Sequence, residues 1–234
     1  MNPIIAVIPS RGGSKRIPLK SLEMINGQTM LARTIELAKS ANIFAKILVS
    51  TDNQLIADAA ILAGAEVPSL RSEFFDDISP VSLATIHTFE SLVKQNESFS
   101  NATIVQLMPN CPFLSVQTLL DCVKTHEKLD NQSLLSCVKI DAINWYAFKL
   151  ENDHPNWIVN DINLDARTQD NPPIFVPSGS VWIAKAEYLL AHKSFYGTRF
   201  LFHEIPFLEG YDIDSFEQLD FARVIEKGMR QNIV

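Results

Sequence analysis

Short continuous apolar runs alternate along the chain with stretches in which apolar residues recur every three or four positions. The runs are typical of strands buried on both faces of a parallel sheet, and they occupy residues 4–9, 46–50, 103–108, 133–140 and 179–184, with weaker signals at 66–67 and 200–204. The recurring positions predict helices at residues 28–40, 54–63, 82–94, 115–126 and from 215 onward. The alternation predicts an α/β fold, a Rossmann-like doubly wound and mostly parallel sheet with right-handed crossovers.

The alternation breaks between residues 141 and 173. This segment contains Trp145, Tyr146, Phe148 and Trp157 among many Asn and Asp residues. Because aromatic side chains need a surface to bury against, we expect an excursion from the sheet and not a linker. One of two interpretations is that these aromatics fold back on their own domain. The chain is then a single domain over residues 1–234 with an insertion at 141–173.

Composition narrows the class of protein. The 234 residues carry a net charge of −7, and 47% of them are apolar, as in ordinary globular proteins. The negative charge argues against a nucleic-acid-binding surface, and no apolar run reaches the roughly 18–20 residues that span a membrane. The three cysteines form no CxxC pair, which argues against a disulfide framework and structural zinc. With no signal peptide, the cytoplasm is the expected compartment.

The segment after the first predicted strand is a candidate phosphate-binding loop. Its glycines let backbone N–H groups approach an anion, and ligands of open α/β sheets bind beyond the carboxyl ends of the strands. The loop is neither a Walker A motif nor a GxGxxG fingerprint, and its alternative interpretation is a solvated basic surface loop. It combines two adjacent glycines with four cations: Gly12, Gly13, Arg11, Lys15, Arg16 and Lys20.

A candidate metal-binding site lies near the C-terminus, at Asp212 and Asp214. Residues two apart in an extended segment point the same way, so both carboxylates can face one site. Hard oxygen ligands with incomplete protein coordination suit Mg²⁺, which keeps waters and binds substrate phosphates. The alternative is that Asp214, or the neighbouring Ser215, caps the last helix.

These motifs resemble those of a known family. The segment from Ser10 to Ser21 is similar to the opening signature of the acylneuraminate cytidylyltransferases, which transfer CMP from CTP to nine-carbon 2-keto acid sugars (nonulosonates). Further similar blocks follow in order at residues 49–52, 65–71, 77, 108–112, 176–180 and 212–214. The first and last blocks are specific and the middle ones are individually weak. The resemblance covers nearly the whole chain and implies the nucleotide-diphospho-sugar transferase fold.

The resemblance also implies substrates and roles. CTP and an acidic sugar would be the substrates, Arg11, Lys20 and Asp212 would be catalytic, and Asp212 with Asp214 would hold Mg²⁺. The excursion would reach a second subunit, giving a homodimer. Arg71 has an alternative as a surface ion pair, and Asp77 as a helix N-terminal acid. The implied nucleotide-binding residues are Ser10, Arg11, Gly12, Gly13, Ser14, Lys15, Lys20, Ser21, Arg71, Asp77 and Ser79.

Departures from the family concentrate where the acceptor sugar would bind. Met108 replaces a Gln of sialate-activating members, Val176 an Arg and Ser178 an Asn, so an amide's donors and a cation suited to a carboxylate are missing. We therefore expect a nonulosonate other than common sialic acid, such as a legionaminate-like sugar. Two alternatives stay open: a cytidylyltransferase for a 3-deoxy-octulosonate, and a non-catalytic nucleotide-sugar-binding protein. The implied sugar-binding residues are Met108, Arg167, Gln169 and Ser178.

Overall fold

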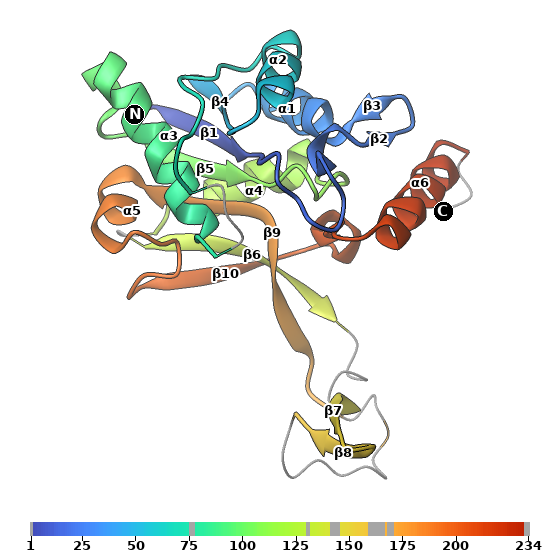
Figure 1. Cartoon of the computed structure of the whole chain (residues 1–234). Helices are drawn as coiled ribbons and strands as arrows, with labels where there is room; N and C mark the ends of the chain where they lie inside the picture. Colours follow the sequence, from blue (N-terminus) through green and yellow to red (C-terminus); the bar gives the residue numbers. More distant parts are fainter. Residues whose placement is uncertain are drawn as a thin grey trace.

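A six-stranded sheet forms the centre of the molecule in a computed structural model that describes residues 2–74, 78–129, 132–140, 146–158, 167 and 171–231 (Figure 1). The spatial order of the strands is β10-β6-β9-β5-β1-β4. Only β9 runs antiparallel to both of its neighbours, and the remaining pairs are parallel. The predicted mostly parallel sheet is confirmed. The strands are β1 Ile4–Pro9, β4 Lys46–Ser50, β5 Thr103–Leu107, β6 Ser133–Ile140, β9 Ile174–Lys185 and β10 Phe200–Ile205.

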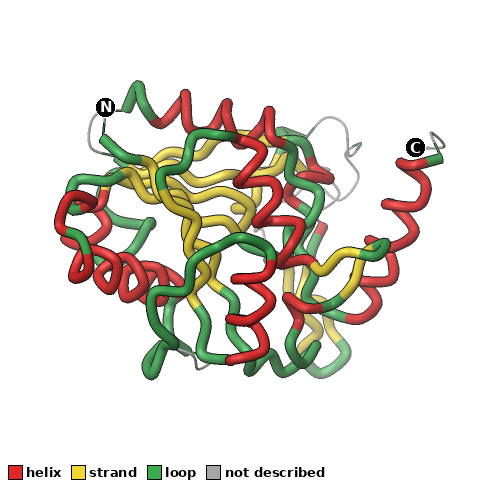
Figure 2. The backbone as a smooth tube through the Cα atoms, turned by 90° about the horizontal axis from the view of Figure 1, so that it is seen from above, coloured by secondary structure: helices red, strands yellow, loops and turns green. Residues whose placement is uncertain are grey.

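Helices cover both faces of the sheet, as the view from above shows (Figure 2). Strand β1 is buried on both sides: Ala6 and Ile8 join the cluster that contains α1, α2 and α4, while Ile5 and Val7 join the one that contains α3 and α5. A continuous apolar run is the pattern that such two-sided burial requires. The helices are α1 Met30–Ala41, α2 Gln54–Leu62, α3 Val81–Gln95, α4 Val116–His126 and α5 Ala186–His192.

A third apolar cluster joins the two ends of the chain. The last helix, α6 (Phe216–Arg230), packs against a short hairpin of β2 (Met24–Ile25) and β3 (Gln28–Thr29). Arg33 of α1 also holds α6 through two contacts to the buried carboxylate of Glu226, at 3.2 and 3.0 Å. This packing brings the candidate loop next to the acidic segment. The cluster consists of Ile17, Ile25, Met30, Ile213, Leu219 and Ala222.

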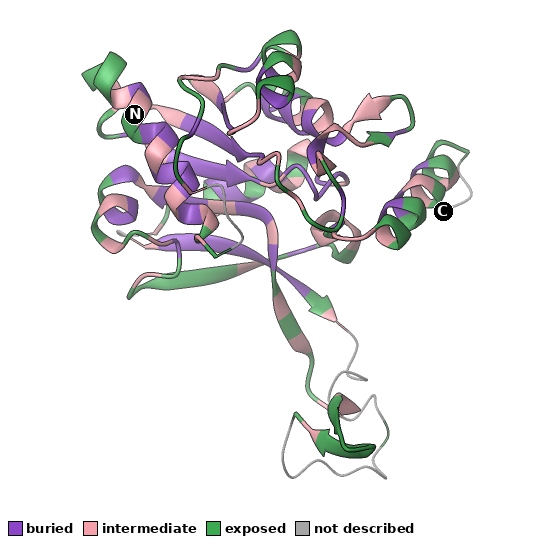
Figure 3. Cartoon of the chain, viewed as in Figure 1, coloured by how far each residue is buried: buried purple, intermediate pink, exposed green. Residues whose placement is uncertain are grey.

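The excursion ends in a hairpin of β7 (Phe148–Glu151) and β8 (His154–Trp157). Asn152 and Asp153 form its turn with positive φ angles of 51° and 64°, which Asn and Asp tolerate better than most residues. The hairpin lies far from the sheet and is largely exposed (Figures 1 and 3). The rings of Phe148 and Trp157 contact each other, with 5.2 Å between their centroids. The ribbon of the hairpin lies at the end of an arm and does not fold back over the sheet (Figure 1). Trp145 lies outside the described residues.

Three predicted boundaries need correction. The helix expected over residues 28–40 begins at Met30, because Gln28–Thr29 pairs with Met24–Ile25 across an Asn26–Gly27 turn. The strand expected at 179–184 is the longer β9, whose first half is held extended by pairing with β6. The strand expected at 66–67 is a single bridge from Glu66 to Leu48.

Two further differences concern helices. Helix α5 was not predicted, because seven residues are too few to show a clear helical period. In α6, Leu219 and Ala222 are buried, whereas the apolar Phe216 and Phe221 are exposed, so the apolar positions of this helix do not all face the core. Within the described residues, no helix has both the length and the apolar character needed to cross a membrane. Short 3₁₀ helices complete the fold at Lys20–Leu22, Glu97–Phe99 and Phe207–Gly210.

Candidate active site

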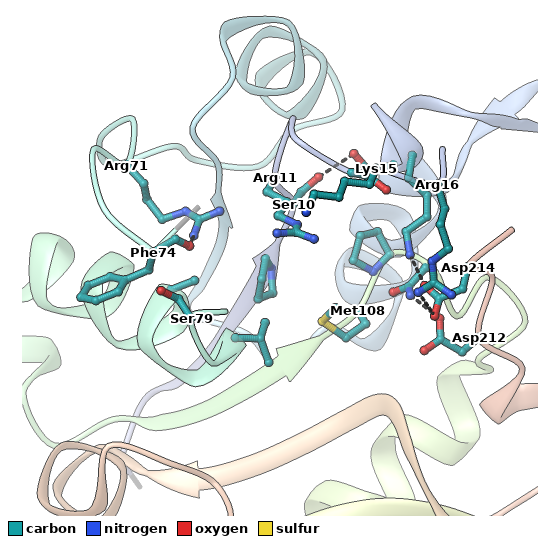
Figure 4. A pocket seen from close by; sticks show the side chains of 18 residues that line it. Ser10, Arg11, Lys15, Arg16, Arg71, Phe74, Ser79, Met108, Asp212 and Asp214 are labelled. Atoms are coloured by element: carbon teal, nitrogen blue, oxygen red, sulfur yellow. Dashed lines mark hydrogen bonds and ion pairs between the residues drawn. The ribbon is translucent and has the colours of Figure 1, made fainter. Parts of the chain in front are cut away.

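A pocket of about 660 Å³ opens at the carboxyl ends of β1 and β5 (Figure 4). Its walls come from the loop after β1, the segment before α3 with the first turn of that helix, the loop after β5 and the acidic segment before α6. The loop and the acidic segment are nearly 200 residues apart in sequence, and the fold brings them to one cavity. An open α/β sheet binds its ligands at this edge.

The loop after β1 is docked onto the end of β4. The Ser10 amide donates to the Ser50 carbonyl at 2.8 Å, and the Gly12 amide donates to Asp52 Oδ1 at 2.8 Å. The Ser10 hydroxyl donates to that of Ser21 at 2.6 Å. The Gly12 N–H is therefore engaged by the protein itself. Ser10, Ser14 and Ser21 line the pocket, whereas the predicted nucleotide-binding residues Gly12 and Gly13 are not among its described lining residues.

The pocket lining is positively charged within an acidic chain. Five lining residues are cations and two are carboxylates, so the lining carries a net formal charge of +3, against −7 for the whole chain. Such a cavity concentrates field lines and favours an anionic ligand. Lys15 and Arg16 are exposed, as in the solvated loop of the alternative interpretation, whereas Arg11 and Lys20 are half-buried. The cations are Arg11, Lys15, Arg16, Lys20 and Arg71.

Lys20 joins the loop to the acidic segment. Its ammonium donates to Asp214 Oδ1 at 2.7 Å and to the Ile213 carbonyl at 2.9 Å. Arg16 reaches the other oxygen of Asp214 at 2.6 Å. Burial raises the pKa of Asp214, but the hydrogen bond and charge of Lys20 and the charge of Arg16 outweigh that effect and hold the pKa below its ordinary value. Asp214 is therefore a carboxylate at neutral pH.

Asp212 stands in a different environment. Part of its side chain is exposed in the pocket, but many protein atoms surround the carboxyl group. This desolvation, together with the negative charge of Asp214, raises the pKa of Asp212 to about 6. The side-chain amide of Asn110 donates to Asp212 Oδ1, and the Asn110 carbonyl accepts from the Ile213 amide at 2.9 Å. Ile213 between the two acids is fully buried. The predicted same-side orientation of Asp212 and Asp214 thus brings both into the pocket.

The acidic segment offers oxygen donors for a hard cation. Besides the two carboxylates, the buried Oδ1 of Asn110 has no hydrogen-bond partner. No group of three His, Cys, Asp or Glu side chains in the described part of the chain could enclose a metal ion. Asp212 and the amide oxygen of Asn110 suit Mg²⁺, which fills its remaining positions with water and substrate phosphates. Asp214 would join them by exchanging a bond to Lys20 or Arg16 for the ion.

Arg71 forms the opposite end of the pocket (Figure 4). It is only 5% exposed, so it is not the surface ion pair of the alternative interpretation. Its guanidinium donates to the Phe74 carbonyl, while its Nε is buried without a partner. Burial lowers its pKa, and the charge of Asp52 opposes this. A buried donor beside Phe74 and Ser79, which also line the pocket, suits a ligand with hydrogen-bond acceptors. Asp77 lies outside the described residues.

The predicted sugar-binding residues are only partly brought together. Met108 lines the pocket and packs over Gly179, where a Cβ atom would lie 3.3 Å from Met108 Cγ. Ser178 is buried against Ser180, with 2.8 Å between the hydroxyls, and is not among the described lining residues. Arg167 is exposed and does not line the pocket either. Gln169 lies outside the described residues.

Some pocket residues were not predicted. Phe74, Pro109 and Asn110 line the pocket, and Asn110 follows the carboxyl end of β5 closely enough for the sheet-edge rule to have indicated it. Nearby Cys111 is buried, and burial, with the charge of Asp212, raises the pKa of its thiol to about 12. It is therefore protonated at neutral pH and unsuited to nucleophilic attack.

A cation-lined pocket at the carboxyl edge of a doubly wound sheet defines a nucleotide-binding α/β protein. More specifically, the chain belongs to the cytidylyltransferase family, because residues 5–233 match the family model described as "Cytidylyltransferase". The family assignment made from the motifs is confirmed.

Curated relatives agree with this assignment. The chain is 33% identical to CMP-N,N'-diacetyllegionaminic acid synthase of Legionella pneumophila, covering 98% of this chain and 97% of the relative. It is 25% identical to a pseudaminic acid cytidylyltransferase of Campylobacter jejuni, covering 95% and 96%. It is 27% identical to an N-acylneuraminate cytidylyltransferase of Escherichia coli, covering 98% of this chain and 53% of that protein.

Solved structures confirm the fold. A CMP:2-keto-3-deoxy-manno-octonic acid synthetase in complex with CTP superposes with a TM-score of 0.73 at 15% identity, over 99% of this chain and all of the other. A 4-diphosphocytidyl-2C-methyl-D-erythritol synthase of Anaerococcus prevotii gives a TM-score of 0.61 at 14% identity, over 97% and 99%.

Proposed function

We propose that the protein activates a nonulosonate with CTP, giving a CMP-sugar and pyrophosphate. The observation that carries the proposal is the convergence of the loop cations and the Asp212–Asp214 pair on one pocket in a chain of the cytidylyltransferase family. In the reaction, the anomeric hydroxyl oxygen of the sugar forms a bond to the α-phosphorus of CTP. The bond from that phosphorus to the β-phosphate oxygen breaks, and the hydroxyl proton passes to solvent.

The loop residues act on the triphosphate. Arg11 and Lys20 hold it and stabilise the negative charge that grows on the departing pyrophosphate. Lys20 is well placed for this because its ammonium is fixed between the loop and the acidic segment. Arg71 and Phe74, at the far end of the pocket, offer a buried donor and a ring to the cytidine.

Asp212 and Asp214 would hold Mg²⁺, with Asn110 beside them. When bound, the ion neutralises phosphate charge and polarises the phosphoryl group. The protein's part is to keep both acids facing the pocket, which burial of Ile213 achieves, and to keep Asp214 ionised through Lys20 and Arg16.

The acceptor we propose is a legionaminate-like sugar. The similarity to the Legionella synthase supports it, as does the apolar thioether that Met108 contributes to the pocket. The test is pyrophosphate release with CTP and Mg²⁺ against legionaminic, pseudaminic, N-acetylneuraminic and 3-deoxy-octulosonic acids. We expect the highest kcat/KM with the legionaminate. Turnover of the octulosonate alone would favour the first alternative, and CTP binding without any turnover would favour the non-catalytic binding protein.

We further propose that the chain acts as a cytoplasmic homodimer joined through the excursion. The side chains of Phe148 and Leu150 in the hairpin, and of Ile158 directly after it, are 46%, 70% and 61% exposed. Exposed apolar residues at the end of an arm are typical of an interaction site. All three cysteines are free thiols, as a reducing compartment would leave them. Light scattering is expected to give twice the mass of one chain at micromolar concentration, and the mass of a single chain would contradict the dimer.

A further inference from the structure

We propose that Asp52 is a positioning residue of the CTP site, fixing the phosphate loop and orienting its cations. The inference rests on the proposed function, because it concerns the nucleotide-binding half of the pocket. Asp52 does not line the pocket among the described residues. It lies in the turn between β4 and α2, and its carboxylate accepts from the Gly12 amide of the loop.

The carboxylate of Asp52 is not used to cap a helix. The cap of α2 is Asn53, whose side chain accepts from the amides of Leu55 and Ile56 at 2.9 and 3.3 Å. Thr51 fixes the same turn, because its hydroxyl accepts from the Asn53 amide at 3.1 Å. The turn is therefore satisfied without Asp52, whose side chain is turned toward the loop.

Two observations show that the loop rests on this turn. The amide of Gly12 donates to Asp52 Oδ1 at 2.8 Å. A Cβ atom at Gly12 would lie 2.9 Å from the Cβ of Asn53, so only glycine lets the loop approach this closely. A charge-assisted hydrogen bond of this kind is stronger than a neutral one. It holds the loop next to Arg11, whose side chain lines the pocket.

The charge of Asp52 has a second target. Burial and the positive charge of Arg11 both disfavour the charged form of Arg71. The negative charge of Asp52 favours it and so opposes both effects. The backbone of Arg71 is anchored at the same turn, where its amide donates to the Thr51 carbonyl at 2.8 Å. One carboxylate thus steadies the loop backbone and lets two cations share one end of the pocket.

Two variants separate the hydrogen bond from the charge. Asp52→Asn keeps an oxygen that can accept from Gly12 but removes the charge, and Asp52→Ala removes both. We expect the Kd for CTP, measured by calorimetry, to rise about tenfold in Asp52→Ala, the loss of one charge-assisted hydrogen bond, and by a smaller factor in Asp52→Asn. The KM for CTP should rise in parallel, while the KM for the acceptor stays unchanged. Asp58→Ala, the same change at an exposed site of α2, is the matched control and should bind CTP like the wild type.

The outcomes separate the possible failures. A wild-type protein that binds no CTP contradicts the proposed function itself. A wild type that binds CTP while Asp52→Ala binds within twofold of it overturns only the positioning role. The role is also overturned if Asp52→Ala loses CTP binding and thermal stability together while Asp52→Asn matches the wild type in both. A weakened Kd at an unchanged Tm supports it.

Discussion

The pocket and the excursion differ in burial: the walls of the pocket rest on buried residues of the same chain, whereas the described part of the excursion is largely exposed. Around the pocket, Ile17, Ile25 and Ile213 are fully buried under α6, and ion pairs lock the loop to the acidic segment. In the described part of the excursion, apolar residues face solvent, and the rings of Phe148 and Trp157 pack against each other. The chain therefore builds its phosphate chemistry on rigid, buried supports, whereas the excursion presents a surface that suits a second subunit.

The largest expected effect is at the acidic pair. We expect Asp212→Asn to lower kcat/KM by roughly 10²–10³-fold, because one ligand for Mg²⁺ and its charge are lost, while CTP binding measured without metal persists. Asp220→Asn on the exposed side of α6 is the matched control and should retain full activity. An Asp212→Asn enzyme with wild-type kcat/KM would remove the metal-binding role of this end of the pocket.

The next effect concerns the stability of the packing that supports the pocket, in which α6 is held by Arg33. Glu226→Ala leaves the half-buried Arg33 with the Ile25 carbonyl but without its carboxylate partner, so the unfolding free energy should fall by about 2 kcal/mol. The control Asp220→Ala breaks only an exposed pair with Arg223 and should cost about 0.5 kcal/mol or less. Urea denaturation followed by circular dichroism measures both. Equal, small losses would show that the third cluster holds without its ion pair.

The pH dependence gives a third effect. The raised pKa of Asp212, about 6, means that this side chain takes up a proton as the pH falls through 6. Because a metal ligand must be deprotonated, activity at limiting Mg²⁺ should drop about tenfold for each pH unit below 6. More Mg²⁺ competes with the proton and should move this acid limb to lower pH. An acid limb that does not respond to Mg²⁺ would assign the proton to another group.

The smallest effect on stability is expected in the excursion. Leu150→Ser replaces a 70% exposed side chain and should change the unfolding free energy of one subunit by less than about 0.5 kcal/mol. The same change should shift the monomer–dimer equilibrium measured by analytical ultracentrifugation. Lys149→Ser, also exposed on the hairpin, is the control. A stability loss of several kcal/mol would mean that the excursion packs on its own chain after all.

The sequence predicted the rigid region better than the excursion. Strand β1 and the N-cap Ser215 of α6 follow local rules that the sequence analysis used, whereas the reciprocal partner Gln218 of this cap was not predicted. The length of β9 and the exposure of Phe216 depend on neighbours distant in sequence. The same holds for the site: the cations and acids were predicted from their motifs, whereas Asn110 and Asp52 act through contacts with residues far along the chain.

The central claim is that the loop cations and the acidic pair form one site for CTP and Mg²⁺. It is tested most directly by incubating the protein with CTP, N,N'-diacetyllegionaminic acid and Mg²⁺, and analysing the products by mass spectrometry. We expect a CMP-sugar and pyrophosphate in equal amounts, and neither product when EDTA is present. Equal product formation with and without EDTA would contradict the metal's place in the site, and no CMP-sugar with any nonulosonic acid would contradict the account as a whole.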